Sequence, residues 1–268
     1  MEQHGQNQPK LVIAIIPARY GSIRLPGKML REIAGKALIL HTLGQAKKVR
    51  NVSRVIVATD DERIFNVVNE HGGEAVMTSA VHRSGSDRLA EVAETLPDGS
   101  IIVNVQGDEP TISPLTIEKA VDALLADDSA DMSTTCEAIE STEDLINPNI
   151  VKVVTNDAGY AVYFSRSPIP YPRDAAMKYE GSDDALRNEP ELLSLFRKHT
   201  GLYVYRREFL LRFAQMPQTK LEKIEMLEQL RALENGAKIK VVEVHEPSIG
   251  VDTPEDFERV KRIIESNG

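Results

Sequence analysis

The chain has 268 residues, a formal net charge of −9 at pH 7 and one cysteine. This length allows one large domain or two small ones with a sizeable buried core. The acidic balance argues against a general nucleic-acid binder, so positive charge must be local, at a site. A single cysteine excludes an intrachain disulfide, and Cys136 lies in a strand-like run that predicts a small buried side chain.

The N-terminal stretch is polar and lacks the apolar core of a signal peptide, so residues 1–10 are expected to form a flexible tail. No apolar run approaches the roughly 20 residues needed to cross a bilayer. These features predict a cytoplasmic protein without a membrane-spanning segment.

The first half of the chain alternates strand-like and helix-like segments. Residues 11–16 form a continuous apolar run of the kind found in strands that are buried on both faces. The helix expected over 86–96 has Ser86 or Asp87 as its N-cap, and the helix over 113–127 has Pro114 at its start. The remaining segments are strands within 54–60, 74–79 and 100–110 and helices over 37–49 and 61–72.

This alternation is typical of an α/β fold, with a mostly parallel mixed sheet and helices on both faces. Ligands of such sheets bind beyond the carboxyl ends of the strands. The loop after residue 16, Asp60–Asp61 and the segment 106–110 all follow strand ends, so we expect them to converge on one rim.

The second half contains more strands and fewer helices. Strands are expected within 151–156, 161–166, 199–210 and 238–244, with a hairpin turn at 157–159. The polar segment 173–198 is predicted to be rich in loops and to act as a mobile lid or an oligomer contact.

Two helices are expected in this half. The first, over 219–236, buries a stripe of Leu221, Ile224, Leu227 and Leu230, and the last helix has Thr253 as its N-cap. With no clear linker, we expect a single domain over 11–265, with a smaller β-rich excursion in the second half.

The segment "IIPARYGSIRLPGKML", residues 15–30, carries three cations and no acid. It lacks the G-x-G-x-x-G fingerprint, and its Gly21 and Gly27 are spaced too widely for a Walker A loop, with Met29 where the metal-binding hydroxyl would be. Arg19, Arg24 and Lys28 match the charge of a triphosphate, and we interpret the loop as a bare cationic phosphate cradle.

This segment resembles the signature of sugar nucleotidyltransferases that activate acidic sugars with CTP. Further segments occur in the expected order, namely "VIVATDD", "MTSAVHRSGSDRLAEV", "IIVNVQGDEP", "NPNIVKVV", "YAVYFSR", "HTGLYVYRREFL", "LEKIEMLEQLRALENG" and "GVDTPEDFERV". Together they resemble the 3-deoxy-manno-octulosonate (KDO) cytidylyltransferase family from about residue 12 to 260, and least from 174 to 197.

The resemblance implies the Rossmann-like nucleotidyltransferase fold and transfer of CMP from CTP to the anomeric hydroxyl of KDO, an acidic eight-carbon sugar. The products are pyrophosphate and CMP-KDO, for lipopolysaccharide synthesis. It also implies Mg²⁺ as cofactor and a homodimer, with 11–140 mainly binding CTP and 151–235 mainly binding the sugar and the second subunit.

The resemblance also implies the site residues. Catalysis falls to Lys28, Arg24 and Arg19 with the metal ligands Asp108 and Asp252. The nucleotide contacts are Pro17, Ala18, Arg19, Ser22, Lys28, Ser84, Gly85, Gln106 and Gly107. The sugar contacts are Gln106, Arg166, Arg173, His199, Tyr203, Glu228 and Gln229.

Several of these residues also have structural interpretations. A carboxylate such as Asp108 at the end of a buried strand is costly without a partner, whereas Asp252 could cap a turn; Glu109 is a weaker metal candidate. Asp60 and Asp61 are expected to cap the following helix. His199 could be an ordinary strand histidine, and Glu228 with Arg231 could be an exposed helix ion pair.

The chain departs from the family at one motif, where S-G-T-E-R-L is usual and Ser86 and Asp87 stand here in place of Thr and Glu. Ser84 and Gly85 therefore carry over as nucleotide contacts and Asp87 does not.

No general base stands out, so we hypothesise that the metal lowers the pKa of the sugar hydroxyl. The alternatives are another acid sugar (8-amino KDO or neuraminic acid), a non-catalytic CTP sensor, and a glycosyltransferase, for which no D-x-D follows the strand ends.

Overall fold

The computed structural model describes residues 10–22, 24–82, 84–246 and 248–266. The predicted tail, apart from Lys10, lies outside these residues. The first half contains β1 (Val12–Ala18), η1 (Lys28–Leu30), β2 (Glu32–Ile33), β3 (Lys36–Ala37), α1 (Leu38–Ala46), β4 (Arg54–Thr59), α2 (Glu62–Glu70), β5 (Ala75–Met77), α3 (Gly85–Glu94), β6 (Ile101–Asn104) and α4 (Pro114–Leu125).

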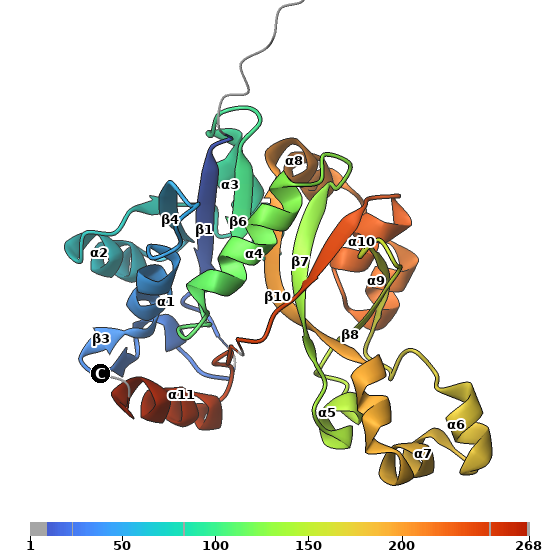
Figure 1. The fold of residues 1–268 in the computed structure, drawn as a ribbon. Helices are drawn as coiled ribbons and strands as arrows, with labels where there is room; N and C mark the ends of the chain where they lie inside the picture. The colour runs from blue at the N-terminus through green and yellow to red at the C-terminus, as the bar shows by residue number, and fades with distance from the viewer. Residues whose placement is uncertain (1–9, 23, 83, 247, 267–268) are drawn as a thin grey trace, which may run out of the picture.

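The second half contains β7 (Met132–Ala138), α5 (Thr142–Ile146), β8 (Lys152–Thr155), β9 (Ala161–Ser165), α6 (Arg173–Lys178), α7 (Ser182–Asn188), η2 (Pro190–Leu195), β10 (Arg197–Arg206), α8 (Arg207–Gln215), α9 (Lys220–Glu225), α10 (Gln229–Glu234), β11 (Ile239–Glu243) and α11 (Pro254–Ser266). Figure 1 shows the sheet in the middle of the molecule, with helices on both of its faces.

The main sheet runs in the order β11-β7-β10-β6-β1-β4-β5, with the β8–β9 hairpin joined to β10. The pairs β1–β4, β1–β6, β4–β5 and β11–β7 are parallel, and β10 is antiparallel to both of its neighbours, β6 and β7. The prediction of a mostly parallel mixed sheet is confirmed. Because β1, β4 and β6 run in the same direction, the loops that follow them meet at one rim.

The apolar residues of β1 explain why this strand occupies the centre. Val12, Ala14 and Ile16 pack into the core beneath α1, α4 and α11, while Ile13 and Ile15 pack into the core beneath α3, α8 and α10. Successive side chains of a strand point to opposite faces, so a continuous apolar run fits a strand covered on both sides. Fully burying one such isoleucine contributes about 2–3 kcal/mol to the free energy of unfolding. Ile15→Ala would therefore destabilise the central strand from which the rim extends.

Strand β10 carries an irregularity that aims its side chains. Its register against β7 shifts between His199 and Tyr203, on either side of Gly201. Such bulges re-aim side chains next to ligand sites. Tyr203 pairs with Asn104 of β6, which brings β10 beside the segment that leads to Asp108.

The segment 173–198 is helical, so the prediction that it is rich in loops was wrong. It contains α6, α7 and η2, which lie with α5 beside the end of the sheet (Figure 1). Leu186 and Phe196 are buried together with Leu145 of α5 and Ile139. The helices are short, and each buries at most two side chains, with none buried in η2, which is too weak a pattern for sequence periodicity to detect.

The helix expected over 219–236 is in fact two helices, α9 and α10. Between them Met226 adopts a left-handed conformation (φ 52°), and Ile224, expected in the buried stripe, is 66% exposed. Leu227 and Leu230 are buried as expected, and Leu221 is partly buried. The break turns Glu222 into the protein, where its carboxylate pairs with Arg231.

The helix starts and the buried cysteine that were predicted from short sequence patterns are mostly confirmed. The N-cap of helix α3 lies two or three residues earlier than expected, at Ser84 rather than Ser86 or Asp87, and Ser84 forms a capping box with Asp87. Pro114 opens α4, and the Thr253 hydroxyl accepts from the backbone N–H of Asp256 at the start of α11. Cys136 is buried, as predicted.

The β8–β9 connection forms the expected hairpin, with Gly159 at φ 75°, a conformation that favours glycine.

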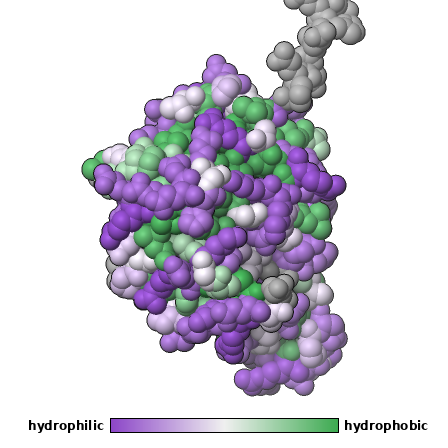
Figure 2. Space-filling model, turned by 90° about the vertical axis from the view of Figure 1, so that its left-hand side faces the viewer, coloured by the Kyte–Doolittle hydropathy of each residue, from purple (hydrophilic) through white to green (hydrophobic). Residues whose placement is uncertain are grey.

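Figure 2 shows that the face on the α2 side of the molecule is mainly hydrophilic, with hydrophobic residues scattered across it. Among the residues that the structure describes, no helix is long and apolar enough to span a membrane.

Candidate active site

The cations of the first loop and the carboxylates of two distant loops form one compact cluster at the rim. The Lys28 ammonium donates to Asp108 Oδ2 at 2.6 Å, to Asp252 Oδ1 at 3.0 Å and to the carbonyl of Val251 at 2.9 Å. Arg24 Nη2 donates to Asp252 Oδ2 at 2.8 Å. We call Lys28, Arg24, Asp108 and Asp252 the Lys28 cluster.

The protein backbone fixes this cluster. Gly27 precedes η1 with a φ of 66°, which turns Lys28 inward, and the backbone N–H of Val251 donates to the carbonyl of Asp108 at 2.9 Å. Burial opposes the charge of Lys28, but Asp108 and Asp252 outweigh it and raise the pKa of the ammonium above its usual value. Lys28 is therefore charged at all ordinary pH values.

The interpretation of a bare cationic loop is accordingly wrong for Lys28 and Arg24. The loop contains no acid, but the fold brings Asp108 and Asp252 to it from 80 and 224 positions away. A buried ammonium is costly without a compensating charge, and the two carboxylates supply it.

The donor set fits a magnesium ion. Asp108 and Asp252 each place one oxygen on the same Lys28 nitrogen, so the two carboxylates are near neighbours. The described residues contain no group of three or more His, Cys, Asp or Glu side chains that could hold a metal. Mg²⁺ suits such a pair, because it is commonly bound by one or two carboxylates, with substrate phosphates and water completing its shell.

Arg19 joins the end of β1 to the segment before α3. Its Nη2 donates to the carbonyls of His82 and Ser84 at 2.8 and 3.1 Å. Pro17 and Ala18 end β1, and Gly85 lies so close to Pro17 that a Cβ on it would be 3.8 Å from the proline ring. The structure thus brings together Pro17, Ala18, Arg19, Ser84 and Gly85, and places Ser22 in the loop between β1 and η1.

Gly107 occupies a position that no side chain could share. An added Cβ would lie 2.8 Å from the carbonyl oxygen of Pro17 and 3.2 Å from Met29, and the carbonyl of Gly107 accepts from Thr42 at 2.9 Å. A glycine is therefore required at position 107 for the close packing of the segment after β6 against the end of β1.

Three residues of the expected sugar side lie in β10 or just after β6, namely Gln106, His199 and Tyr203, and the weaker metal candidate Glu109 lies near them. Gln106 Nε2 donates to the carbonyl of Gly201 at 3.3 Å, and a Cβ on Gly201 would be 3.5 Å from Glu109 Oε1. The rings of His199 and Tyr203 are 5.2 Å apart. Burial, followed by the charge of Asp108, raises the pKa of Glu109 to about 7, so this carboxyl stands out more than the sequence indicated.

His199 is a neutral side chain. Burial lowers its pKa to about 3, its Nε2 is 2.8 Å from Thr134 Oγ1, and Phe164 packs edge-on against its ring. A group with so low a pKa cannot serve as a general base of useful strength near pH 7. The structural interpretation of a strand histidine therefore fits, and His199 can bind a ligand through a hydrogen bond only.

The two arginines expected to bind the sugar carboxylate differ in their hydrogen-bond partners and in their exposure. Arg166 donates to three backbone carbonyls, those of Glu225 (2.7 Å), Pro148 (2.8 Å) and Met226 (3.3 Å). Arg173 is exposed at the first position of α6. Arg166 is held in place near the α9–α10 break, whereas Arg173 lies on the peripheral helices.

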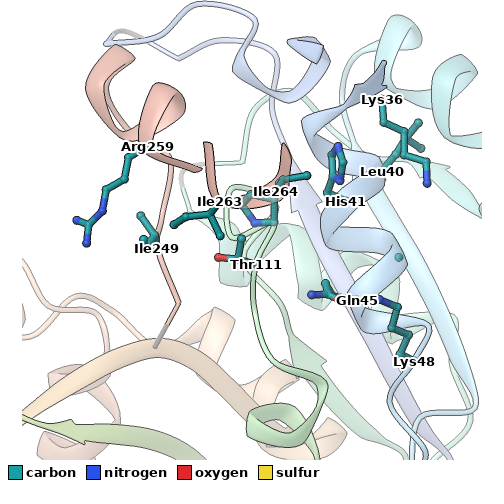
Figure 3. Close-up of a pocket in the computed structure, with 12 residues that line it drawn as sticks. Lys36, Leu40, His41, Gln45, Lys48, Thr111, Ile249, Arg259, Ile263 and Ile264 are labelled. Atoms are coloured by element: carbon teal, nitrogen blue, oxygen red, sulfur yellow. Dashed lines mark hydrogen bonds between the residues drawn. The ribbon is translucent and has the colours of Figure 1, made fainter. Parts of the chain in front are cut away.

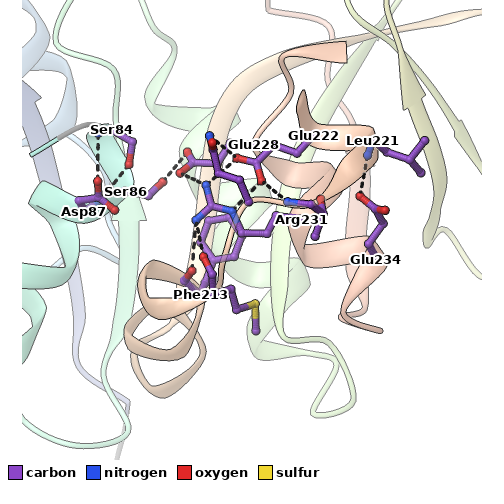
Figure 4. A network of polar contacts seen from close by, with 12 residues as sticks. Ser84, Ser86, Asp87, Phe213, Leu221, Glu222, Glu228, Arg231 and Glu234 are labelled. Carbon is purple, nitrogen blue, oxygen red and sulfur yellow. Dashed lines mark hydrogen bonds and ion pairs between the residues drawn. The ribbon is translucent and has the colours of Figure 1, made fainter. Parts of the chain in front are cut away.

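Glu228 and Gln229 begin α10, and Gln229 is buried. The interpretation of Glu228 and Arg231 as an exposed ion pair is wrong, because Arg231 is 6% exposed and also binds the buried Glu222 (Figure 4). Sequence reasoning did not find Glu222. Its signal was Thr219-x-x-Glu222, which forms a capping box in the structure.

Asp60 and Asp61 have structural roles. Asp61 caps α2 by accepting from the backbone N–H of Arg63, as expected. Asp60 instead pairs at 2.7 Å with Arg88, whose side chain is fully buried in α3. This pair fixes α3 to the end of β4.

Two cavities flank the rim. The first, of about 720 Å³, lies between α1 and α11 and is lined by Lys36, His41, Thr111, Ile249, Ile263 and others, but by no residue of the predicted site (Figure 3). The second, of about 460 Å³, is lined by Ser84, Asp87, Glu228 and Arg231. The second cavity therefore joins the nucleotide and sugar sides.

Comparisons with known proteins agree with this geometry. The family model described as "Cytidylyltransferase" matches residues 13–239. A 3-deoxy-manno-octulosonate cytidylyltransferase of Geotalea uraniireducens is 55% identical over 249 residues, which is 93% of this chain and 97% of the relative. One from Trichlorobacter lovleyi is 53% identical over 250 residues, again 93% and 97%.

Solved structures extend the comparison. A CMP:2-keto-3-deoxy-manno-octonic acid synthetase complexed with CTP superposes with a TM-score of 0.86 at 40% identity, covering 97% of this chain and all of that chain. A 4-diphosphocytidyl-2C-methyl-D-erythritol synthase from Anaerococcus prevotii shares the fold alone (TM-score 0.62, 14% identity, covering 96% and 99%). The chain belongs to the 3-deoxy-manno-octulosonate cytidylyltransferase family.

Proposed function

We propose that the chain transfers CMP from CTP to the anomeric hydroxyl of KDO and releases pyrophosphate. The observation that carries this proposal is the Lys28 cluster, in which two loop cations and two carboxylates meet at the carboxyl ends of β1 and β6. The relatives named above are cytidylyltransferases for this sugar, and the comparison structure is complexed with CTP.

Lys28 and Arg24 are proposed to bind the triphosphate. Both cations are paired with Asp108 or Asp252 in this structure, and a triphosphate is a more densely charged partner than a half-exposed aspartate. A divalent metal, proposed to be Mg²⁺, would be held by Asp108 and Asp252 and would supply charge neutralisation of the phosphates and a lower pKa for the attacking hydroxyl.

The other residues are proposed to position the two substrates. Pro17, Ala18, Arg19, Ser22, Ser84, Gly85 and Gly107 would contact the nucleotide, and Gln106 both substrates. Arg166, Arg173, His199, Tyr203, Glu228 and Gln229 would contact the acidic sugar. Holding the hydroxyl in line with the α-phosphorus is the main gain, because phosphoryl-type transfers depend on positioning and electrostatics.

The domain division, the cytoplasmic location and the homodimer remain parts of the proposal. Supporting the dimer, several large apolar side chains of the second half are exposed, among them Val162, Tyr171, Met177 and Leu195. A contiguous exposed apolar patch is typical of a subunit contact, and the proposed dimer requires these side chains to form one. Light scattering should give twice the mass of the chain for the wild type, and monomers for a Val162→Asp, Met177→Asp double variant.

One assay tests the reaction: pyrophosphate release from CTP or UTP, with and without KDO and Mg²⁺. We expect release only with CTP, KDO and Mg²⁺ together. Release with 8-amino KDO or a neuraminic acid but not KDO would change the acceptor. CTP binding without release in any mixture would favour the sensor.

A further inference from the structure

Glu228 is the point where the nucleotide side and the sugar side of the proposed site touch. The Ser86 hydroxyl of α3 donates to Glu228 Oε2 at 2.8 Å, and Arg231 Nη2 donates to Glu228 Oε1 at 3.2 Å (Figure 4). Among the described residues, Ser86 and Arg231 thus each bind one oxygen of the carboxylate, and the Ser84 side chain also interacts with it. A carboxylate has about four acceptor sites, so it can accept a further hydrogen bond from a ligand hydroxyl.

Arg231 is a rigid anchor for one of these oxygens. It forms a two-point ion pair with Glu222, with Nε–Oε2 at 2.9 Å and Nη2–Oε1 at 2.6 Å. Its Nη1 donates to the carbonyls of Phe213 and Met216, both at 3.4 Å, and its guanidinium lies 4.8 Å from the Phe213 ring centre. With so many partners, the Arg231 guanidinium stays in place whether or not a ligand is present.

Ser86 is the anchor for the other oxygen, and it belongs to the opposite part of the site. It is 3% exposed and lies in the first turn of α3, directly after Ser84 and Gly85. The capping box between Ser84 and Asp87 makes this turn a single rigid unit. A ligand that binds Ser84 and Gly85 therefore contacts the same rigid turn that carries the Ser86 hydroxyl, which in turn holds Glu228.

We propose that Ser86 is a positioning residue that aims Glu228 at the hydroxyl groups of the acidic sugar and couples sugar affinity to occupation of the nucleotide site. This inference rests on the proposed function. Ser86 bonds to a residue 142 positions away in the sequence, so its hydroxyl does more than extend the α3 helix.

The test compares three serine variants. Ser86→Ala removes the donor, Ser86→Thr keeps the hydroxyl, and Ser113→Ala is a matched control that removes a helix N-cap hydroxyl from α4. Binding of KDO is measured by calorimetry with and without Mg²⁺ and α,β-methylene CTP. The KM values for KDO and CTP, kcat and the melting temperature are measured in parallel.

We expect α,β-methylene CTP to tighten KDO binding to the wild-type protein and not to Ser86→Ala. The KM for KDO should rise about tenfold or more in Ser86→Ala, as expected for losing a hydrogen bond to a charged acceptor, with the KM for CTP changed less than threefold. Ser86→Thr should restore the coupling, and Ser113→Ala should leave it intact. In a Glu228→Gln background, Ser86→Ala should cause little further loss, because the pair acts as a unit.

Three results would overturn the proposal. The first is an unchanged KDO affinity in Ser86→Ala. The second is an equal rise in both KM values with a lower melting temperature, which would mean a structural role only. The third is no effect of the CTP analogue on KDO binding to the wild type. Should Ser86→Ala not fold, Ser86→Cys keeps the volume with a weaker donor and must show the same KDO-specific loss. Failure of the proposed function is a separate result, because wild type would then release no pyrophosphate with KDO.

Discussion

The Lys28 cluster at the rim and a second ionic cluster at α9 and α10 differ in how firmly each is held. In the Lys28 cluster the carboxylates are accessible, with the side chains of Asp108 and Asp252 26% and 49% exposed. In the second cluster, formed by Arg231, Glu222 and Glu228, the side chains of Arg231 and Glu222 are 8% and 5% exposed. Water and ligands can therefore reach Asp108 and Asp252 more easily than Glu222, although the Lys28 side chain between the two aspartates is 9% exposed.

The partners differ in the same way. Asp252 is paired with two cations that both come from one loop, whereas Arg231 combines a two-point ion pair with carbonyl and ring contacts. Exchanging the partners of a water-accessible ion pair costs little free energy. Removing one partner of a buried ion pair costs much more, because the remaining charge stays desolvated without compensation. The comparison indicates that the Lys28 cluster exchanges partners with the ligand, whereas the Arg231–Glu222 pair is scaffold that holds Glu228.

The sharpest way to break this comparison is to remove Arg231. Arg231→Met should lower the free energy of unfolding by about 3–5 kcal/mol, because it leaves Glu222 buried and unpaired. Urea unfolding followed by circular dichroism measures this loss. The matched control is Arg187→Met, whose exposed partner is Asp184 and whose cost should stay within about 0.5 kcal/mol.

A double variant separates charge from packing. Glu222→Gln combined with Arg231→Met should recover part of the stability, since Glu222, the more deeply buried of the two carboxylates that Arg231 pairs with, then carries no charge. Equal losses for Arg231→Met and Arg187→Met would show that the Arg231–Glu222 pair is not scaffold.

Removing Lys28 should lower turnover strongly and the free energy of unfolding only slightly. Lys28→Met should reduce turnover about 100- to 1,000-fold, as for the loss of one donor that stabilises developing charge, while stability falls by only about 1 kcal/mol. Stability changes little because Arg24 still pairs with Asp252 and both carboxylates are accessible to water. Pyrophosphate release and urea unfolding give the two numbers.

Metal binding supplies a second measurement on the same variant. Without Lys28 competing for Asp108 and Asp252, Mg²⁺ alone should raise the melting temperature of Lys28→Met more than that of the wild type. Lys47→Met, at the C-terminal end of α1, serves as the control and should behave as wild type in each assay. Near-normal turnover in Lys28→Met would exclude the triphosphate role.

The sequence predicted the sheet well because its central strands, β1, β4 and β6, are buried on both faces. The run from Val12 to Ile16 leaves no polar position for an exposed face, and its alternation between the two cores follows directly from strand geometry. The α9–α10 break was not predictable in this way. Apolar spacing treats Glu222 as an exposed helix position, whereas its burial depends on a partner, Arg231, that is nine positions further on.

The site shows the same limit. Strand ends predicted that Asp108 would lie at the rim beside the first loop, because parallel strands end together. The pairing of Lys28 with Asp108 and Asp252 was missed, since side chains 80 and 224 positions apart meet only in the folded chain. The contact between Ser86 and Glu228 was missed for the same reason.

The smallest expected effect is on the pH dependence of stability. It comes from Glu109, which lies beside Asp108 in the sequence. Its pKa is raised from 4.5 to about 7 by burial and then by the charge of Asp108. A carboxyl with a raised pKa in the folded state contributes stability that is fully present below pH 4.5 and is lost as the pH rises through 7. The slope for one group cannot exceed about 1.4 kcal/mol per pH unit.

The free energy of unfolding of the wild type should therefore fall between pH 5 and 8 relative to that of Glu109→Gln, which cannot ionise. Glu143→Gln, on exposed α5, should follow the wild-type curve. Saturating Mg²⁺ with CTP should reduce the difference, because a cation next to Asp108 offsets the charge that keeps Glu109 protonated. Parallel curves for wild type and Glu109→Gln would mean that water reaches Glu109 freely, and the rim would then be more open than its contacts indicate.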